Sequence, residues 1–98
     1  MADSDDTFIE RADAHIFLSN DQIAKGVSAG KVSASNMYAT ARFNVWLSAS
    51  GCESGEELAE GKTEITEYFV AEYKKMLEEN LDNYSKNFAN YMKGSNGK

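Results

Sequence analysis

Few side chains in this 98-residue chain are of kinds that perform chemistry, and their spacing matches no familiar catalytic or metal-binding arrangement. His15 is the only histidine and Cys52 the only cysteine, so the chain lacks the nitrogen and sulfur ligands of a usual zinc site. As a general base, His15 would need a nucleophile or a substrate within hydrogen-bond reach. We therefore expect a structural histidine, no catalytic residue, no metal and no cofactor.

Glutamate is the most concentrated functional side chain, with nine glutamates between residues 53 and 79. Carboxylate-bridged metal sites in helical bundles use Glu-x-x-His pairs, and the chain contains no such pair. Four of them, Glu56, Glu57, Glu60 and Glu64, are therefore expected to form a solvated face. The net charge of −6 argues against binding to the phosphate backbone of nucleic acids.

Two polar residues, Arg42 and Asn44, interrupt an otherwise apolar segment. If they are buried they must be paired, because an unpaired buried charge is costly. Together with His15 they form a candidate polar cluster, which could pair with acids of neighbouring helices, fix the register of an oligomer interface, or bind a ligand. A small-molecule pocket near His15, Tyr38, Arg42 and Trp46 is the alternative functional hypothesis.

The elements that position these residues are helices, as the spacing of apolar residues and the absence of proline indicate. The sequence predicts an all-α fold with three main helices, over about 7–25, 33–50 and 63–93. They form a single domain, 7–93, between a disordered N-terminus, 1–6, and a disordered tail, 94–98.

Capping residues refine these boundaries. Thr7 and Glu10 match a capping box, Ser33 is the expected N-cap of the second helix, and Gly51 is expected in a left-handed conformation after its end. Ser54 could open a short helical turn interrupted by Gly61, but we favour an irregular loop over 54–62.

The second helix is apolar on nearly all sides, which favours a central position in the fold. Its tryptophan, Trp46, is then expected to be largely buried.

The third helix is the most informative element. A continuous helix over 63–93 would be roughly 45 Å long, more than a compact domain of this size covers with its own chain. Part of its apolar side is therefore expected to pack on a second copy of the protein, together with a face of the second helix. The candidate interface residues are Tyr73, Leu77, Leu81, Tyr84, Phe88 and Tyr91.

Three segments resemble one family. They are FIERADAH at 8–15, KVSASNMYATARFN at 31–44 and EYFVAEYKKMLEENLD at 67–82. Over roughly 8–88 the chain resembles a family of small, uncharacterised, mostly proteobacterial proteins, domain of unknown function thirty-one forty-four. The resemblance implies a helical fold and a bacterial, cytosolic origin. It implies no activity, cofactor or site residue.

The sequence thus favours a small acidic protein that works through association and is not an enzyme. We expect a homodimer, with an unidentified protein partner as a further possibility. No charged-then-apolar leader opens the chain and no apolar run approaches the length of a membrane span, so we expect a cytoplasmic protein that binds neither membrane nor nucleic acid.

Overall fold

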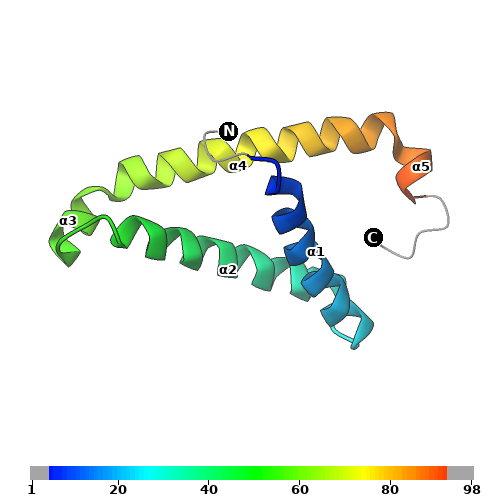
Figure 1. The fold of residues 1–98 in the computed structure, drawn as a ribbon, viewed down its shortest axis with the longest axis horizontal. Coiled ribbons are helices and arrows are strands. Elements are labelled where there is room, and N and C mark those ends of the chain that lie inside the picture. The colour runs from blue at the N-terminus through cyan, green and yellow to red at the C-terminus, as the bar shows by residue number, and fades with distance from the viewer. Residues whose placement is uncertain (1–4, 93–98) are drawn as a thin grey trace. The chain divides into compact units, whose positions relative to one another are not determined.

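The computed structural model describes residues 5–92, which fold into helices joined by short turns (Figure 1). The helices are α1 (Phe8–Ala24), α2 (Ala29–Ala49), α3 (Gly55–Glu60), α4 (Lys62–Lys86) and α5 (Phe88–Met92). No strand occurs among residues 5–92, and the predicted all-α fold is confirmed. The predicted tail, 94–98, and the first four residues of the predicted disordered segment 1–6 lie outside the described range.

Packing within the chain separates two units, Met1–Ala39 and Thr40–Lys98. The boundary falls inside α2, so the N-terminal unit holds α1 and the first half of α2. The C-terminal unit holds the second half of α2 and helices α3 to α5. The single domain over 7–93 stays a prediction.

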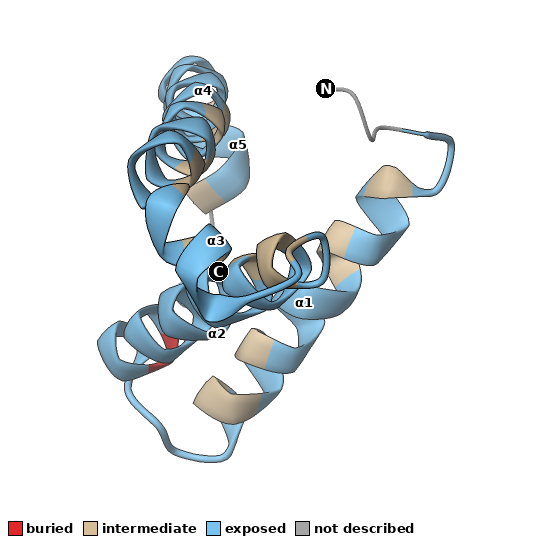
Figure 2. Ribbon diagram, turned by 90° about the vertical axis from the view of Figure 1, so that its left-hand side faces the viewer, coloured by how far each residue is buried: buried red, intermediate tan, exposed pale blue. Residues whose placement is uncertain are grey.

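The N-terminal unit contains Val32, which is 3% exposed and is the one residue in 5–92 classed as buried; Figure 2 draws buried residues red. On α1, the apolar residues Phe8, Ala12 and Ile23 are half-buried. A side-chain hydrogen bond connects the two helices, from the Asn36 Nδ2 atom to the Ser19 hydroxyl at 2.9 Å.

Gly26 ends α1 with a backbone conformation that other residues rarely adopt, a φ of +104°. The N–H groups of Gly26 and Val27 donate to the carbonyls of Ile23 and Gln22, at 3.0 and 3.2 Å. These two bonds form a Schellman motif, in which a left-handed glycine satisfies the last carbonyls of a helix. The predicted first helix, 7–25, is therefore confirmed, with glycine as its stop signal.

Two predicted helix starts differ in detail. Thr7 is the N-cap residue of α1, as predicted, but the capping box does not form, because the Thr7 hydroxyl is bonded to Asp5 and Arg11 instead. Helix α2 begins at Ala29, four residues before the predicted start, so Ser33 lies inside it. The Ser28 hydroxyl accepts a bond from the Lys31 N–H at 3.4 Å, which makes this earlier serine the residue at the helix start.

Residues around 51–60 also differ from the prediction. Gly26 is the one glycine with a positive φ in the described chain, so Gly51 is not left-handed. Helix α2 instead closes with bonds from the N–H groups of Gly51 and Cys52 to carbonyls three residues earlier.

The favoured loop over 54–62 is wrong, because α3 forms there. The Ser54 hydroxyl accepts from the Glu57 N–H at 3.0 Å, and Glu57 Oε1 accepts from the Glu53 N–H at 2.8 Å. These bonds resemble a capping box.

The long third helix is present but is interrupted near its end. It begins at Lys62, one residue before the predicted start, and ends at Lys86, after which Asn87 has φ −119° and ψ +27°. Asn87 Nδ2 donates to the Asn83 carbonyl at 3.0 Å, a bond that Asn80 also makes to the Met76 carbonyl within α4, so this bond does not by itself end the helix.

Helix α2 is not buried on nearly all sides, contrary to the prediction. Trp46 is 61% exposed, and its ring lies 5.5 Å from that of Phe43, measured between centroids. The expectation failed because it assumed that the neighbouring helices would cover both faces of α2.

Replacing Gly26 by alanine should lower the free energy of unfolding by about 1 kcal/mol, because a Cβ atom disfavours the left-handed region. A Cβ atom at residue 26 would meet no other atom within 4 Å, so the effect is conformational rather than steric. Urea unfolding followed by circular dichroism measures it.

The matched control is Gly30→Ala, where a Cβ atom would also meet no other atom within 4 Å but the backbone is helical. Alanine there should raise the stability by up to about 1 kcal/mol. A loss of stability in both variants, or in neither, would contradict the assignment.

Candidate association surface

Helix α4 has two apolar faces. The first contains Ile65, Phe69 and Met76, which are half-buried at helical spacing together with Glu72. The second consists of the predicted interface residues on α4, and it continues through the two on α5, Phe88 and Tyr91. All of these are exposed, from 41% for Tyr84 to 64% for Phe88. We call this second set the α4–α5 stripe: Tyr73, Leu77, Leu81, Tyr84, Phe88 and Tyr91.

A helix turns about 100° per residue, which places the centres of the two faces about 100° apart around α4. In sequence the two sets merge into one pattern, because each repeats at steps of three and four. The structure separates them by exposure. Val70, which is 60% exposed and lies seven residues before Leu77, extends the exposed face and was missed by the sequence prediction.

The stripe continues across the break at Asn87 into α5. There the rings of Tyr84 and Tyr91 lie 4.5 Å apart between centroids, with an angle of 35° between their planes. The five-residue helix α5 therefore folds one end of the stripe onto itself. Phe88, between the two tyrosines in sequence, makes no ring contact with another described residue and stays exposed.

Ion pairs within α4 lie beside these faces. Lys74 pairs with Glu78 at 2.6 Å, and Lys75 pairs with Glu72 at 2.7 Å. The hydrogen bond to Glu72 raises the pKa of Lys75, and the charge of Glu72 adds to this effect. Such exposed ion pairs along one helix contribute little to stability. They neutralise part of the charge next to the apolar faces.

The predicted polar cluster is distributed over both units. His15 lies on α1, where it is exposed. Arg42 and Asn44 lie on the second half of α2, where Arg42 is exposed and Asn44 half-buried. Because Arg42 is solvated, it needs no partner, and it forms no ion pair with any other residue of 5–92. The cluster itself stays a prediction.

The hypothetical small-molecule pocket also stays a prediction. Tyr38 and Trp46, its two aromatic members, are 67% and 61% exposed. They lie in different units, Tyr38 in the first and Trp46 in the second.

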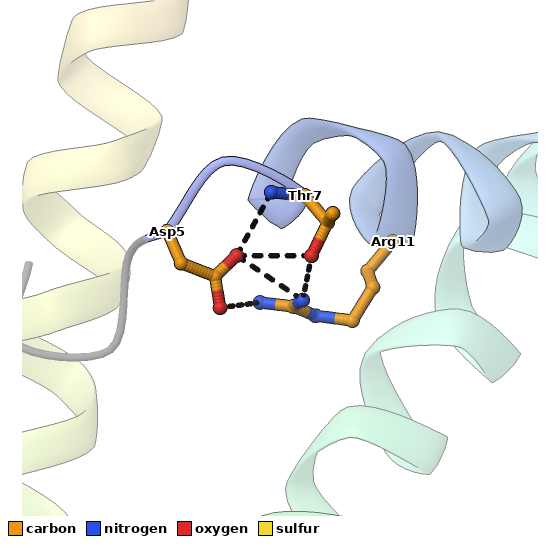
Figure 3. Close-up of polar contacts among 3 residues, drawn as sticks. All are labelled: Asp5, Thr7 and Arg11. Atoms are coloured by element: carbon orange, nitrogen blue, oxygen red, sulfur yellow. Dashed lines mark hydrogen bonds and ion pairs between the residues drawn. The ribbon is translucent and has the colours of Figure 1, made fainter.

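A polar cluster at the start of α1 was missed by the sequence prediction (Figure 3). Asp5 Oδ1 accepts bonds from the Thr7 N–H at 2.9 Å and from the Thr7 hydroxyl at 3.0 Å. The Arg11 Nη1 atom donates to the Thr7 hydroxyl at 2.6 Å and lies 3.3 Å from Asp5 Oδ1. The signal was in the spacing: an aspartate two residues before the threonine, and an arginine one helical turn after it.

This cluster fixes the entry of the chain into α1 and offers no reactive group, since all three side chains are exposed and mutually bonded. The cluster does lower the pKa of one of its side chains. The N–H of Thr7, its hydroxyl and the Arg11 guanidinium, in that order, hold the pKa of Asp5 below its ordinary value of 3.8.

Residues 5–92 present neither a metal-holding group of side chains nor a membrane-spanning helix. No group of three or more His, Cys, Asp or Glu side chains in that range is placed to hold a metal ion. None of α1 to α5 combines the length and the apolar character that crossing a bilayer requires.

The Asp5 cluster predicts the direction of two effects in a carboxyl titration followed by NMR. The pKa of Asp5 should lie below 3.8 in the wild type, and Thr7→Val and Arg11→Gln should each raise it, because each removes a group that favours the charged carboxylate. The lowered pKa stabilises the folded state at pH values above the unfolded-state pKa, and this stabilisation is lost as the pH falls through the folded-state pKa. An unchanged pKa in either variant would contradict the geometry.

Comparison with known proteins adds a family and a fold. The family model described as "Protein of unknown function (DUF3144)" matches residues 8–85. A solved structure, the NMR structure of the protein NB7890A from Shewanella sp, is 34% identical with a TM-score of 0.74, and the alignment covers 94% of this chain and 97% of that one. No curated protein matches. The family resemblance carried by the three sequence segments is thus confirmed, and the chain belongs to the DUF3144 family of proteins of unknown function.

Proposed function

We propose that this protein works by association rather than catalysis, as a homodimer held together by the α4–α5 stripe and an exposed face of α2. One observation carries the proposal. All six residues of the stripe are exposed, whereas Val32 is the one residue of the described chain that is buried. Soluble monomers rarely expose large contiguous apolar patches, and pairing of two copies about a two-fold axis is the commonest way to cover one.

The size of the stripe supports a contribution from α2. Fully burying one aromatic side chain removes roughly 150–250 Å² from water. Six large side chains that are about half exposed therefore offer on the order of 500 Å² per copy, whereas a stable interface needs about 800 Å² per partner. The stripe alone falls short of that area.

The face of α2 that supplies the remainder consists of Phe43, Trp46 and Leu47, each more than half exposed. These residues belong to the same unit as the stripe. The rings of Phe43 and Trp46 already contact each other, and a contiguous aromatic pair is the kind of anchor that dominates protein interfaces.

The spacing of the stripe supports a second helix as the occupant. From Leu77 through Leu81, Tyr84 and Phe88 to Tyr91 the steps are four, three, four and three residues. This alternation is the a/d pattern with which one helix packs along another. A different, unidentified protein that presents such a helix is the alternative occupant.

The proposal also covers nucleic acids and location. The net charge of −6 opposes binding to nucleic acids, and we propose a cytoplasmic location.

Sedimentation equilibrium tests the homodimer. The wild-type chain should show a concentration-dependent monomer–dimer equilibrium, and Leu81→Glu should raise the dissociation constant at least tenfold, because it places a charge in the seam of both copies. The matched control is Tyr68→Glu, since Tyr68 is exposed to a similar degree, 54% against 57% for Leu81, but lies on another side of α4.

Circular dichroism should show unchanged helix content in both variants, since neither residue is buried. A wild-type chain that stays monomeric up to the highest soluble concentration would refute the homodimer. Equal weakening by both substitutions would show that the stripe is not the contact surface.

A further inference from the structure

We propose that Asn87 is a hinge between two states of the C-terminal helix, and that pairing selects the state in which α4 and α5 form one continuous helix. This inference rests on the proposed association and adds to it the shape that the surface takes when it is covered. The structure shows the other state, in which the chain bends at Asn87 and Tyr91 packs on Tyr84.

The side chains permit a continuous helix. No glycine or proline lies between Lys62 and Met92, and the step pattern of the stripe passes through Asn87 without a change of phase. If the helix always ended at residue 86, an apolar repeat in the same helical phase would not be expected beyond that residue.

The backbone would also gain from straightening. Two backbone bonds span the bend, from the Asn87 N–H to the Asn83 carbonyl at 3.1 Å and from the Tyr91 N–H to the Asn87 carbonyl at 3.0 Å. A continuous helix would add the remaining bonds of the ladder, from the N–H groups of residues 88–90 to the carbonyls of residues 84–86. These three bonds do not form across the bend.

One contact is specific to the bent state: the rings of Tyr84 and Tyr91 lie 4.5 Å apart. The Asn87 side-chain bond to the Asn83 carbonyl is compatible with either state, because Asn80 makes the same bond to the Met76 carbonyl inside α4. In a continuous helix, residues seven apart are separated by about 10.5 Å along the axis, so the ring contact and the straight helix exclude each other. The chain thus exchanges a ring pair for three backbone bonds, which is a basis for two states of similar free energy.

Pairing would shift this balance because the two states present different surfaces. In the bent state Tyr84 and Tyr91 cover part of each other, and the seam is interrupted. In the straight state Leu77 to Tyr91 lie along one side and contact a partner over their full length. A partner that binds the straight state better raises its population, and the apparent affinity is reduced by the fraction of chains that are bent.

Substitutions at Asn87 test the hinge in opposite directions. Alanine favours helix over asparagine, enough to shift the equilibrium about threefold per chain, so Asn87→Ala should tighten the dimer by up to about tenfold. Asn87→Gly should weaken it, because glycine disfavours the straight state. The control is Asn83→Ala, the same substitution one turn earlier, within α4 and at an exposed position. It should leave the dissociation constant unchanged.

NMR of the wild-type chain gives the second readout. At the lowest concentrations the rings of Tyr84 and Tyr91 should show a mutual Overhauser effect. At concentrations where the dimer dominates, this effect should vanish while the amide groups of residues 88–90 become protected from exchange.

The outcomes separate the two proposals. A dimer whose affinity is the same in Asn87→Ala and Asn87→Gly, and which keeps the ring contact, would overturn the hinge and leave the association standing. A wild-type chain that never dimerises would overturn both.

Discussion

Helix α4 carries apolar side chains over a wider arc than one packing neighbour can cover. Its half-buried and exposed faces are centred about 100° apart, and the apolar stripe that a surface helix normally presents to a core is itself about 100° wide. A single layer of packing therefore leaves one face in water. Two further features of the C-terminal unit accompany this uncovered apolar face of α4. An aromatic face of α2 is also exposed, and a C-terminal turn folds Tyr91 back onto Tyr84.

Local polar contacts, rather than a large core, determine where the helices begin and end. Ser54 and Glu57 bond backbone N–H groups at the start of α3, Asp5 binds the N–H of Thr7 before α1, and Gly26 satisfies the last carbonyls of α1. Each of these contacts lies within one or two turns of chain. They set the start of α3 and both ends of α1.

The sequence was sufficient to predict the fold class, because α1 and α4 have strong apolar periodicity and no proline interrupts any helix. It was weakest where two signals compete. Ser28 and Ser33 are equally plausible caps by residue type, and Asn87 has a helical apolar pattern on both sides, so its side-chain bond to Asn83 could not be predicted from periodicity.

The site was harder to predict than the fold, for a physical reason. The six residues of the stripe were identified by spacing alone, but spacing does not distinguish a face that meets its own chain from one that meets solvent. That difference depends on tertiary packing, which is why Ile65 and Leu77 look alike in sequence and differ in exposure. The burial of Trp46 was predicted wrongly for the same reason.

That Val32 is the one buried residue in the described part of the chain has a thermodynamic consequence for the isolated protein. The heat capacity increment of unfolding scales with the apolar area that becomes hydrated, so an isolated chain of this kind has a shallow stability curve with little dependence on temperature. In the proposed homodimer, further apolar area is dehydrated when two chains meet, in addition to the area that each chain buries as it folds. Part of the thermal stability of such a dimer depends on protein concentration and rises with its logarithm.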